Sequence, residues 1–235
     1  MAQATAPPGG HAAQRFIIVD DHPLFRGALA QVLAAAFAGA RIDEAGSYED
    51  LVPMLAAGPE PDIVCLDLAM PGVQGLAGLM SLKAEYPALP VIIVSATDDA
   101  LTIRRCLDCG ASGYVPKSQP VEKIRQAIAT VLEGGVSVPA NLDPGAAADD
   151  QVRQVLARLS TLTPQQLRVL GMLGEGLLNK QIAYKLGVSE ATIKAHVSAI
   201  LQKLGVDSRT QAVIAINKCG LGAWAHTGLP QTAAD

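Results

Sequence analysis

The sequence is poor in aromatic residues, in cysteine and in long apolar runs. Phe, Tyr and Trp make up 3% of its 235 residues although hydrophobic residues make up 50%, so we expect a core of Ala, Val, Leu and Ile. No apolar run approaches the roughly 20 residues that a membrane-spanning helix needs, and residues 1–14 lack the charged start and apolar centre of a secretory signal. The four cysteines are therefore expected to be reduced thiols. These absences predict a cytoplasmic protein that makes no contact with a membrane.

Charge is distributed unevenly along the chain. Residues 1–150 contain 9 Lys and Arg against 18 Asp and Glu, a net charge of −9, whereas residues 151–222 contain 9 basic and 3 acidic residues, a net charge of +6. With Asp235 the total is −4. We therefore expect only the second part of the chain to contact a polyanion such as nucleic acid.

Two of the cysteines, Cys106 and Cys109, have the Cys-x-x-Cys spacing that also occurs in metal sites and redox pairs. No second pair of cysteine or histidine residues lies at ligand spacing in the sequence. We interpret this segment as the end of a helix.

Short apolar runs alternate with helical patterns over residues 15–133. A continuous apolar run between turn residues is typical of a buried strand, and apolar residues three or four positions apart are typical of a helix face. Ser47 begins one of these helices, although Pro53 should distort or shorten it. The alternation predicts an α/β doubly wound parallel sheet of five strands. The expected strands are residues 16–19, 41–45, 62–68, 91–94 and 113–116, and the expected helices are residues 23–37, from 47, 76–85, 100–109 and 120–133.

A linker and a small all-α domain are expected after the sheet. The linker should cover residues 134–158, which are rich in Gly, Pro and Ala up to Asp150. Two short helices joined by Leu186-Gly187-Val188-Ser189 predict a helix-turn-helix. The helices expected in this domain run over residues 163–174, 179–186, 189–204 and 208–219. The expected divisions are a disordered leader 1–14, a first domain 15–133, the linker 134–158, a second domain 159–222 and a flexible tail 223–235.

Polar side chains follow four of the predicted strands at the point where each strand ends. Because the carboxyl ends of parallel strands meet at one edge of a sheet, these side chains should lie close together. Carboxylates with a backbone carbonyl are ligands that suit Mg²⁺, and phosphoryl transfer depends mainly on positioning and charge neutralisation. The residues concerned are Asp20 and Asp21 after the first strand, Asp67 and the carbonyl of Ala69 after the third, Ser95 after the fourth and Lys117 after the fifth.

This set predicts a magnesium-assisted phosphoryl-acceptor site. Asp67 would accept the phosphoryl group, Lys117 would act as a point charge on its oxygens, and the hydroxyl of Ser95 would donate a hydrogen bond to one of them. Taken singly, each residue also has an ordinary explanation as a turn residue, a helix cap or a solvated charge. Their order on successive strands favours the acceptor site.

Residues 15–133 resemble a bacterial response-regulator receiver domain, which has a flavodoxin-like fold. The resemblance rests on the acidic pair, the acceptor aspartate, the Ser95 hydroxyl and Lys117, with Tyr114 at the place of the family's switch aromatic residue. Many receivers have proline after the lysine, whereas Ser118 stands here, so we assume no cis bond at that place. The resemblance implies phosphorylation of Asp67 by a sensor histidine kinase.

The predicted helix 189–204 is amphipathic. Its apolar face should pack into the small domain, and small or polar residues on the opposite face would let the helix enter the major groove of DNA, although such a face could also be merely solvated. Lys180 and Lys203 could hold phosphates. The apolar face contains Ile193, Val197, Ile200 and Leu204, and the opposite face contains Ala191, Lys194, Ala195, Ser198 and Gln202.

Residues 162–212 closely resemble the LuxR-type helix-turn-helix domain, and its combination with a receiver is similar to the NarL/FixJ class of regulators. The resemblance is carried by Leu162-Thr163-Pro164, Gly176 to Ala183, Leu186 to His196, Lys203 to Val206 and Arg209 to Ala212. It implies promoter DNA as a partner, and a homodimer when the receiver is phosphorylated. It also implies phosphate contacts from Lys180 and Lys203, base or backbone contacts from Thr192, Lys194, Ala195 and Ser198, and either a phosphate contact or a packing role for His196.

Three other functions remain as alternatives. The receiver could be a dimerisation module that is never phosphorylated, but the complete set of acceptor-site residues favours phosphorylation. An aspartate-dependent phosphatase would carry a second aspartate where Ala69 stands, so an enzyme is not expected. A LuxR-type sensor of a small molecule should lack the carboxylate set.

Overall fold

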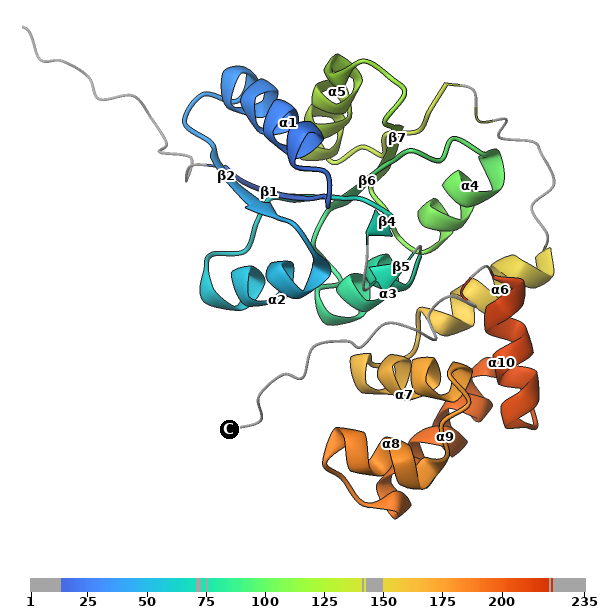
Figure 1. Cartoon of the computed structure of the whole chain (residues 1–235). Helices are drawn as coiled ribbons and strands as arrows, with labels where there is room; N and C mark the ends of the chain where they lie inside the picture. Colours follow the sequence, from blue (N-terminus) through green and yellow to red (C-terminus); the bar gives the residue numbers. More distant parts are fainter. Residues whose placement is uncertain are drawn as a thin grey trace, which may run out of the picture.

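The computed structural model describes residues 14–70, 73–74, 76–140, 142, 150–219 and 221. Its first part is a five-stranded parallel sheet in the order β2-β1-β3-β6-β7 (Figure 1). The strands are β1 Arg15–Val19, β2 Arg41–Ala45, β3 Ile63–Leu66, β6 Val91–Ser95 and β7 Gly113–Pro116. The helices are α1 Pro23–Ala36, α2 Tyr48–Ala57, α3 Leu76–Glu85, α4 Ala100–Asp108 and α5 Val121–Leu132. The predicted doubly wound fold is confirmed.

The core of this part lies on both faces of the sheet. Alternate residues of β1 enter different clusters, Phe16 and Ile18 with α1 and α5, and Ile17 and Val19 with α2, α3 and α4. A strand that is buried on both faces needs a continuous apolar run, which is the pattern in the sequence. The two helical layers are visible in Figure 1.

Two local features differ from the expectation. A short antiparallel pair, β4 Ala69–Met70 and β5 Val73–Gln74, follows β3, where no further strand was expected. Helix α2 continues through Pro53 to Ala57 and is not shortened by it. Ser47 caps this helix, because its side chain accepts a hydrogen bond from the Asp50 N–H at 3.1 Å.

The second part consists of helices. They are α6 Asp150–Leu159, α7 Pro164–Gly174, α8 Asn179–Leu186, α9 Glu190–Leu204 and α10 Arg209–Lys218. Thr163 and Gln166 form the capping box at the start of α7, and Gly187 and Gly205 end α8 and α9 in the left-handed region with φ of 65° and 64°. The predicted helix-turn-helix is therefore present.

Helix α6 corrects the prediction of a linker over residues 134–158. Val152, Leu156 and Leu159 lie on its buried face. The linker residues 141 and 143–149 lie outside the described part of the chain, as do the predicted leader, except for Gln14, and the predicted tail. None of the helices that the structure describes is both long and apolar enough to cross a membrane.

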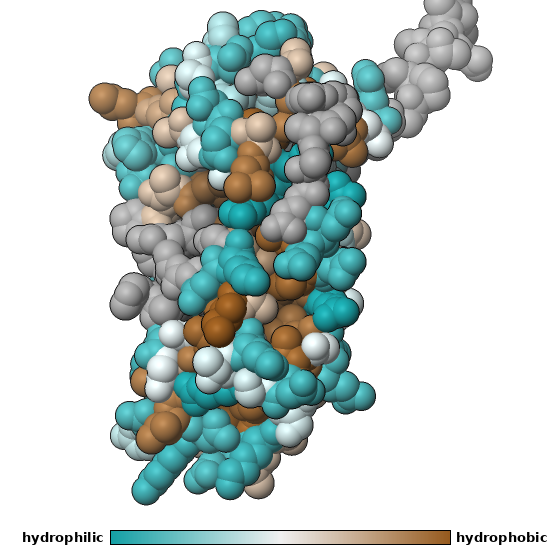
Figure 2. All heavy atoms as spheres, turned by 90° about the vertical axis from the view of Figure 1, so that its right-hand side faces the viewer, coloured by the Kyte–Doolittle hydropathy of each residue, from teal (hydrophilic) through white to brown (hydrophobic). Residues whose placement is uncertain are grey.

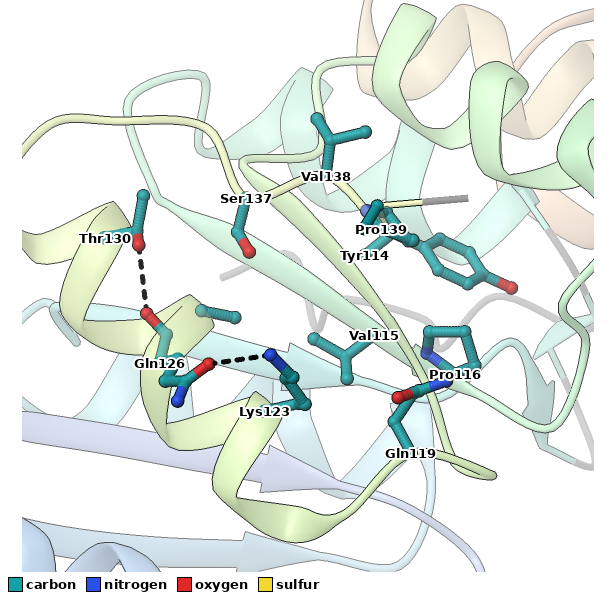
Figure 3. A pocket seen from close by; sticks show the side chains of 12 residues that line it. Tyr114, Val115, Pro116, Gln119, Lys123, Gln126, Thr130, Ser137, Val138 and Pro139 are labelled. Atoms are coloured by element: carbon teal, nitrogen blue, oxygen red, sulfur yellow. Dashed lines mark hydrogen bonds between the residues drawn. The ribbon is translucent and has the colours of Figure 1, made fainter. Parts of the chain in front are cut away.

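The chain after α5 returns along the free edge of β7. The Tyr114 N–H donates to the Ser137 carbonyl at 3.0 Å, and the Ser137 N–H donates to the Ser112 carbonyl at 3.0 Å. We call residues 136–140 the edge segment. Figure 3 shows Ser137, Val138 and Pro139 of this segment across a cavity of about 420 Å³ from Lys123 and Gln126 of α5.

Buried Arg15 connects three segments of the first part. Its Nε lies 2.7 Å from Asp43 Oδ2 on β2, its Nη2 donates to the Met54 carbonyl at 3.1 Å, and its Nη1 donates to the Pro59 carbonyl. Hydrogen bonds on every side allow a charged side chain with 4% exposure to remain in the fold.

Candidate functional site

The acidic residues predicted for the site meet at the carboxyl edge of the sheet. Asp20 follows β1 and Asp67 follows β3, and their side chains are buried with exposures of 3% and 1%. Asp67 Oδ1 accepts a hydrogen bond from the Ala69 N–H at 3.2 Å, which fixes the carboxylate. The parallel pairing of β1 with β3 brings these residues together across 46 intervening positions of sequence.

Lys117 connects the two buried carboxylates. Its Nζ lies 2.7 Å from Asp67 Oδ2 and 2.7 Å from Asp20 Oδ2, and 4.8 Å from the centre of the Phe25 ring. Burial alone would lower the pKa of Lys117, but hydrogen bonds to both carboxylates hold that pKa above its ordinary value. Lys117 is therefore a fixed positive charge beside Asp67.

Oxygen ligands for a divalent cation are grouped beside this lysine. Asp20, Asp21, His22 and Asp67 each offer one ligand atom, and these atoms lie within 4.8 Å of one another. Asp21 Oδ1 is buried and accepts no hydrogen bond. The nearest side-chain nitrogen is His22 Nδ1, 2.7 Å away, which forms an ion pair with this oxygen only if the imidazole is protonated. A buried carboxylate oxygen without a donor, among other carboxylates, fits a hard cation such as Mg²⁺.

His22 was not among the ligands expected from the sequence. Its backbone N–H donates to Asp20 Oδ1 at 2.9 Å, and its side chain is 66% exposed. Its position directly after the acidic pair was the only available signal, and an imidazole is a less suitable ligand for Mg²⁺ than an oxygen.

Ser95 and Tyr114 meet through Thr97. Ser95 Oγ accepts from the Thr97 N–H at 3.3 Å, and the Tyr114 hydroxyl donates to the Thr97 carbonyl at 2.7 Å. Tyr114 is 1% exposed, and burial raises the pKa of its hydroxyl. The residue at the place of the switch aromatic therefore lies inside the fold in this structure.

Helix α9 has the two faces that the sequence predicts. Ile193, Ile200 and Leu204 are buried and Val197 is partly buried. The predicted contact residues lie on the outer side, where Thr192, Lys194, Ala195 and Ser198 are exposed and His196 is partly exposed. Lys180 at the start of α8 is exposed as well. Figure 1 shows α8 and α9 at the end of the molecule away from the sheet.

Two of the predicted DNA-contacting lysines already have partners. Lys194 Nζ lies 3.1 Å from Glu190 on the same helix. Because this ion pair is exposed and weak, a DNA phosphate can take the place of Glu190 as the partner of the lysine. Lys203 Nζ donates to the Thr161 carbonyl at 2.7 Å and to Gln166 Oε1 at 2.8 Å. These bonds tie α9 to the start of α7, so the geometry gives Lys203 a structural position within the domain and does not favour the phosphate contact expected from the sequence.

Comparison with known proteins identifies both parts of the chain. Residues 16–129 match the family described as response regulator receiver domain, and residues 160–216 match the family described as bacterial regulatory proteins, luxR family. The sequence is 38% identical over 206 residues to the glycerol metabolism activator of Pseudomonas putida, covering 85% of this chain and 93% of that protein. It is 34% identical to the transcriptional regulatory protein LnrK of Bacillus subtilis, covering 85% and 94%.

Solved structures share the fold. RcsB from Salmonella enterica serovar Typhimurium, bound to promoter P1flhDC in the presence of the phosphomimetic BeF3⁻, superposes with a TM-score of 0.52 at 23% identity. The similarity covers 87% of this chain and 98% of that one. It supports the arrangement of a flavodoxin-like sheet followed by a small helical domain.

Proposed function

The chain belongs to the two-component response regulators that combine a receiver domain with a LuxR-type helix-turn-helix domain, and we propose that Asp67 accepts a phosphoryl group from a sensor histidine kinase. The family consists of transcription regulators. The observation that supports the acceptor role is the meeting of Asp67 with Lys117, Ser95 and the acidic group at one sheet edge. The proposed domains, residues 15–133 and 159–222, enclose the two matched ranges.

Mg²⁺ would be held by the carboxylates of Asp20, Asp21 and Asp67 and by the Ala69 carbonyl, and it would neutralise charge on the transferred group. Asp67 presents one carboxylate oxygen to phosphorus while the bond to the kinase histidine breaks. Lys117 stabilises the phosphoryl oxygens as a point charge. Ser95 donates its hydroxyl hydrogen to one of them, which requires the hydroxyl to turn from its bond with Thr97.

The proposed output is a homodimer that binds promoter DNA. The proposed location of the protein is the cytoplasm, where promoter DNA is found. Exposed side chains at the start of α9 would enter the major groove, and Lys180 would contact a phosphate. Thr192, Lys194, Ala195 and Ser198 would lie closest to the bases or the backbone, with His196 at the edge of the contact. Lys203 would support α9 through its bonds to Thr161 and Gln166 at the start of α7.

The test is phosphorylation by acetyl phosphate followed on a phosphate-affinity gel. The wild-type chain should acquire an acid-stable, base-labile phosphoryl group that depends on Mg²⁺, and Asp67→Asn should acquire none. Glu49→Gln, a change of a partly exposed carboxylate on α2, is the matched control and should behave as wild type. Equal labelling of Asp67→Asn would refute the assignment. Absence of labelling in every protein, with promoter binding intact, would instead support the receiver as a phosphorylation-independent module.

A further inference from the structure

The ring of Phe25 lies beside the ammonium group of Lys117. Lys117 Nζ is 4.8 Å from the ring centre, which is within the distance of about 6 Å at which a cation is attracted to the face of an aromatic ring. The Lys117 side chain is 14% exposed, so water screens this attraction only in part. The ring is therefore a third partner of the ammonium group, beside Asp20 and Asp67.

The position of Phe25 follows from the way α1 begins. Pro23 is the first residue of this helix, and the Cα–Cβ bonds of a helix tilt towards its amino-terminal end. A side chain in the first turn is thus directed back towards the loop that carries Asp20. Phe25 also packs against the apolar cluster that contains Val115, two residues before Lys117. The ring therefore contacts the core of the receiver as well as the ammonium group.

The backbone of Lys117 is fixed by a hydrogen bond, whereas its long side chain depends on contacts at Nζ. The Lys117 N–H donates to the Ser95 carbonyl at 2.7 Å. Four carbons separate the backbone from Nζ, and a lysine side chain has many rotamers of similar energy. The partners of Nζ therefore decide where the positive charge lies in the site.

Two of the three partners of Lys117 change during the proposed phosphorylation. Asp20 is a proposed ligand of the divalent cation, and Asp67 gives one carboxylate oxygen to phosphorus. Each of these events takes negative charge away from the ammonium group. The ring of Phe25 has no net charge and forms no bond in the reaction, so its attraction for the cation is the same before and after the transfer.

Partial exposure of an aromatic ring is not in itself a sign of function. Figure 2 shows hydrophobic residues at the surface in several places, among hydrophilic ones, and Leu24 beside Phe25 is 91% exposed. Packing alone accounts for Phe37 at the end of α1, whose ring centre lies 5.1 Å from that of Phe16. Phe25 differs from Phe37 because the ammonium group of Lys117 lies over its ring.

We propose that Phe25 is a positioning residue for phosphoryl transfer, which holds the Lys117 ammonium group beside the phosphoryl oxygens through a cation–π contact. This proposal rests on the proposed function of Asp67. Phe25 acts through Lys117 and not through a contact with the transferred group. Removal of the aromatic face should slow the reaction, because the ammonium group then occupies positions away from Asp67 for more of the time.

The first test is the rate at which acetyl phosphate phosphorylates the full chain with Mg²⁺, followed on a phosphate-affinity gel. Phe25→Leu keeps an apolar side chain and removes the aromatic face, and it should lower the rate about fivefold, as expected for the loss of one cation–π contact. Phe25→Tyr keeps the face and should react within about twofold of the wild-type rate. If the Tyr variant is as slow as the Leu variant, the cation–π contact is wrong.

Phe37→Leu is the matched control. It is the same substitution at the end of the same helix and against the same apolar cluster, about 18 Å along the helix axis from Phe25. It should lower the midpoint of thermal unfolding and leave the phosphorylation rate unchanged. A rate that falls equally in Phe25→Leu and Phe37→Leu would indicate a general loss of receiver stability and would overturn the proposal.

A double variant tests whether Phe25 acts through Lys117. Lys117→Met removes the ammonium group, so the addition of Phe25→Leu to this variant should cause no further decrease in the rate. A second fivefold decrease in the double variant would mean that the ring affects the site by another route, and the positioning role would be wrong.

The contact can also be observed without a phosphoryl donor. Protons that lie over an aromatic face resonate at higher field, so the Cε protons of Lys117 should move to lower field in Phe25→Leu and keep their wild-type shift in Phe25→Tyr. Proton NMR of the full chain with labelled lysine measures these shifts. An unchanged shift in Phe25→Leu would contradict the contact.

Failure of this proposal and failure of the proposed function give different results. If the wild-type chain is phosphorylated on Asp67 and Phe25→Leu reacts at the same rate, Phe25 has no positioning role while the proposed function stands. If the wild-type chain acquires no phosphoryl group although the NMR shifts show the ring contact, the proposed function of Asp67 fails. The role of Phe25 in phosphoryl transfer fails with it.

Discussion

Lys117 Nζ lies 2.7 Å from Asp67 Oδ2 and is also bonded to Asp20, so a single ammonium group compensates two buried carboxylates. This positive charge reduces the repulsion between the two carboxylates. The same site must also bind a cation and a phosphoryl group. Lys117 therefore stabilises the resting receiver as well as the transferred group, and the two roles can be separated by experiment.

Lys117→Met should lower the free energy of unfolding by about 3–5 kcal/mol, the usual cost of breaking a buried ion pair from one side. Mg²⁺ should restore part of this loss, because it compensates the same carboxylates, while labelling by acetyl phosphate should fall by about 10²-fold or more. Thermal unfolding with and without Mg²⁺ and a phosphate-affinity gel measure the two effects. Lys123→Met, whose ammonium is bonded only to exposed Gln126, is the control. Wild-type labelling of Lys117→Met would contradict the proposed role.

Lys180 and Lys203 should differ in their effect on DNA binding, although both are lysines of the basic domain. Lys180→Ala should reduce the slope of log affinity against log salt concentration by about 1, because one phosphate contact is lost. Lys203→Ala should leave that slope unchanged and lower the free energy of unfolding by about 1.5–3 kcal/mol, because its two intradomain hydrogen bonds are lost. Titrations of DNA at several salt concentrations, with thermal unfolding, distinguish them. A reduced salt slope in Lys203→Ala would show that Lys203 does contact a DNA phosphate.

Lys194→Ala should change the preference among DNA sequences as well as the affinity. A contact with a base edge is worth about 1–3 kcal/mol of discrimination, whereas a phosphate contact is shared by all sequences. Selection from random DNA with the wild-type and variant chains measures the change. If the variant loses affinity equally for every sequence, Lys194 contacts phosphate alone.

The free energy of unfolding should fall in acid because protonation of Asp43 breaks its ion pair with Arg15. Burial alone would raise the pKa of Asp43, but hydrogen bonds from Arg15 and Arg41 hold it below its ordinary value of 3.8. A carboxyl with a lowered folded-state pKa contributes stability above its unfolded pKa, and that contribution is lost as pH falls through the folded pKa. Urea unfolding between pH 5 and pH 2 should show this decline, and Asp43→Asn should make it shallower. An unchanged decline in the variant would assign the acid sensitivity to other carboxylates.

The fold was largely predictable because its determinants are local. Continuous apolar runs such as Ile63–Leu66 specify strands buried on both faces, and Thr163 with Gln166 marks the start of a helix within four residues. The acceptor site followed from the same strands, since each site residue stands at a strand end. Helix α6 was missed although Val152, Leu156 and Leu159 have helical spacing, because the Gly- and Ala-rich segment before it suggested a longer linker.

The remaining features depend on residues that are distant in sequence. Lys203 is bonded to Thr161 and Gln166, 42 and 37 positions away, and only the folded domain shows that its ammonium is occupied. The position of Tyr114 depends on Thr97 and on the edge segment beside β7. Cys219 meets the Cys106–Cys109 pair only when the domains dock, so spacing along the chain could not reveal the cluster.

The anchoring of Ser137 on β7 limits how far the DNA-binding domain can move away. Only residues 138–149 separate this anchor from the start of α6 at Asp150. A chain of about 12 residues reaches at most about 40 Å in any conformation, and tethers of this length give effective concentrations in the millimolar range. Any contact between the two domains with an intrinsic dissociation constant of about 1 mM would therefore be formed in roughly half of the molecules. Because the tether sets this fraction, dilution of the protein should not change it.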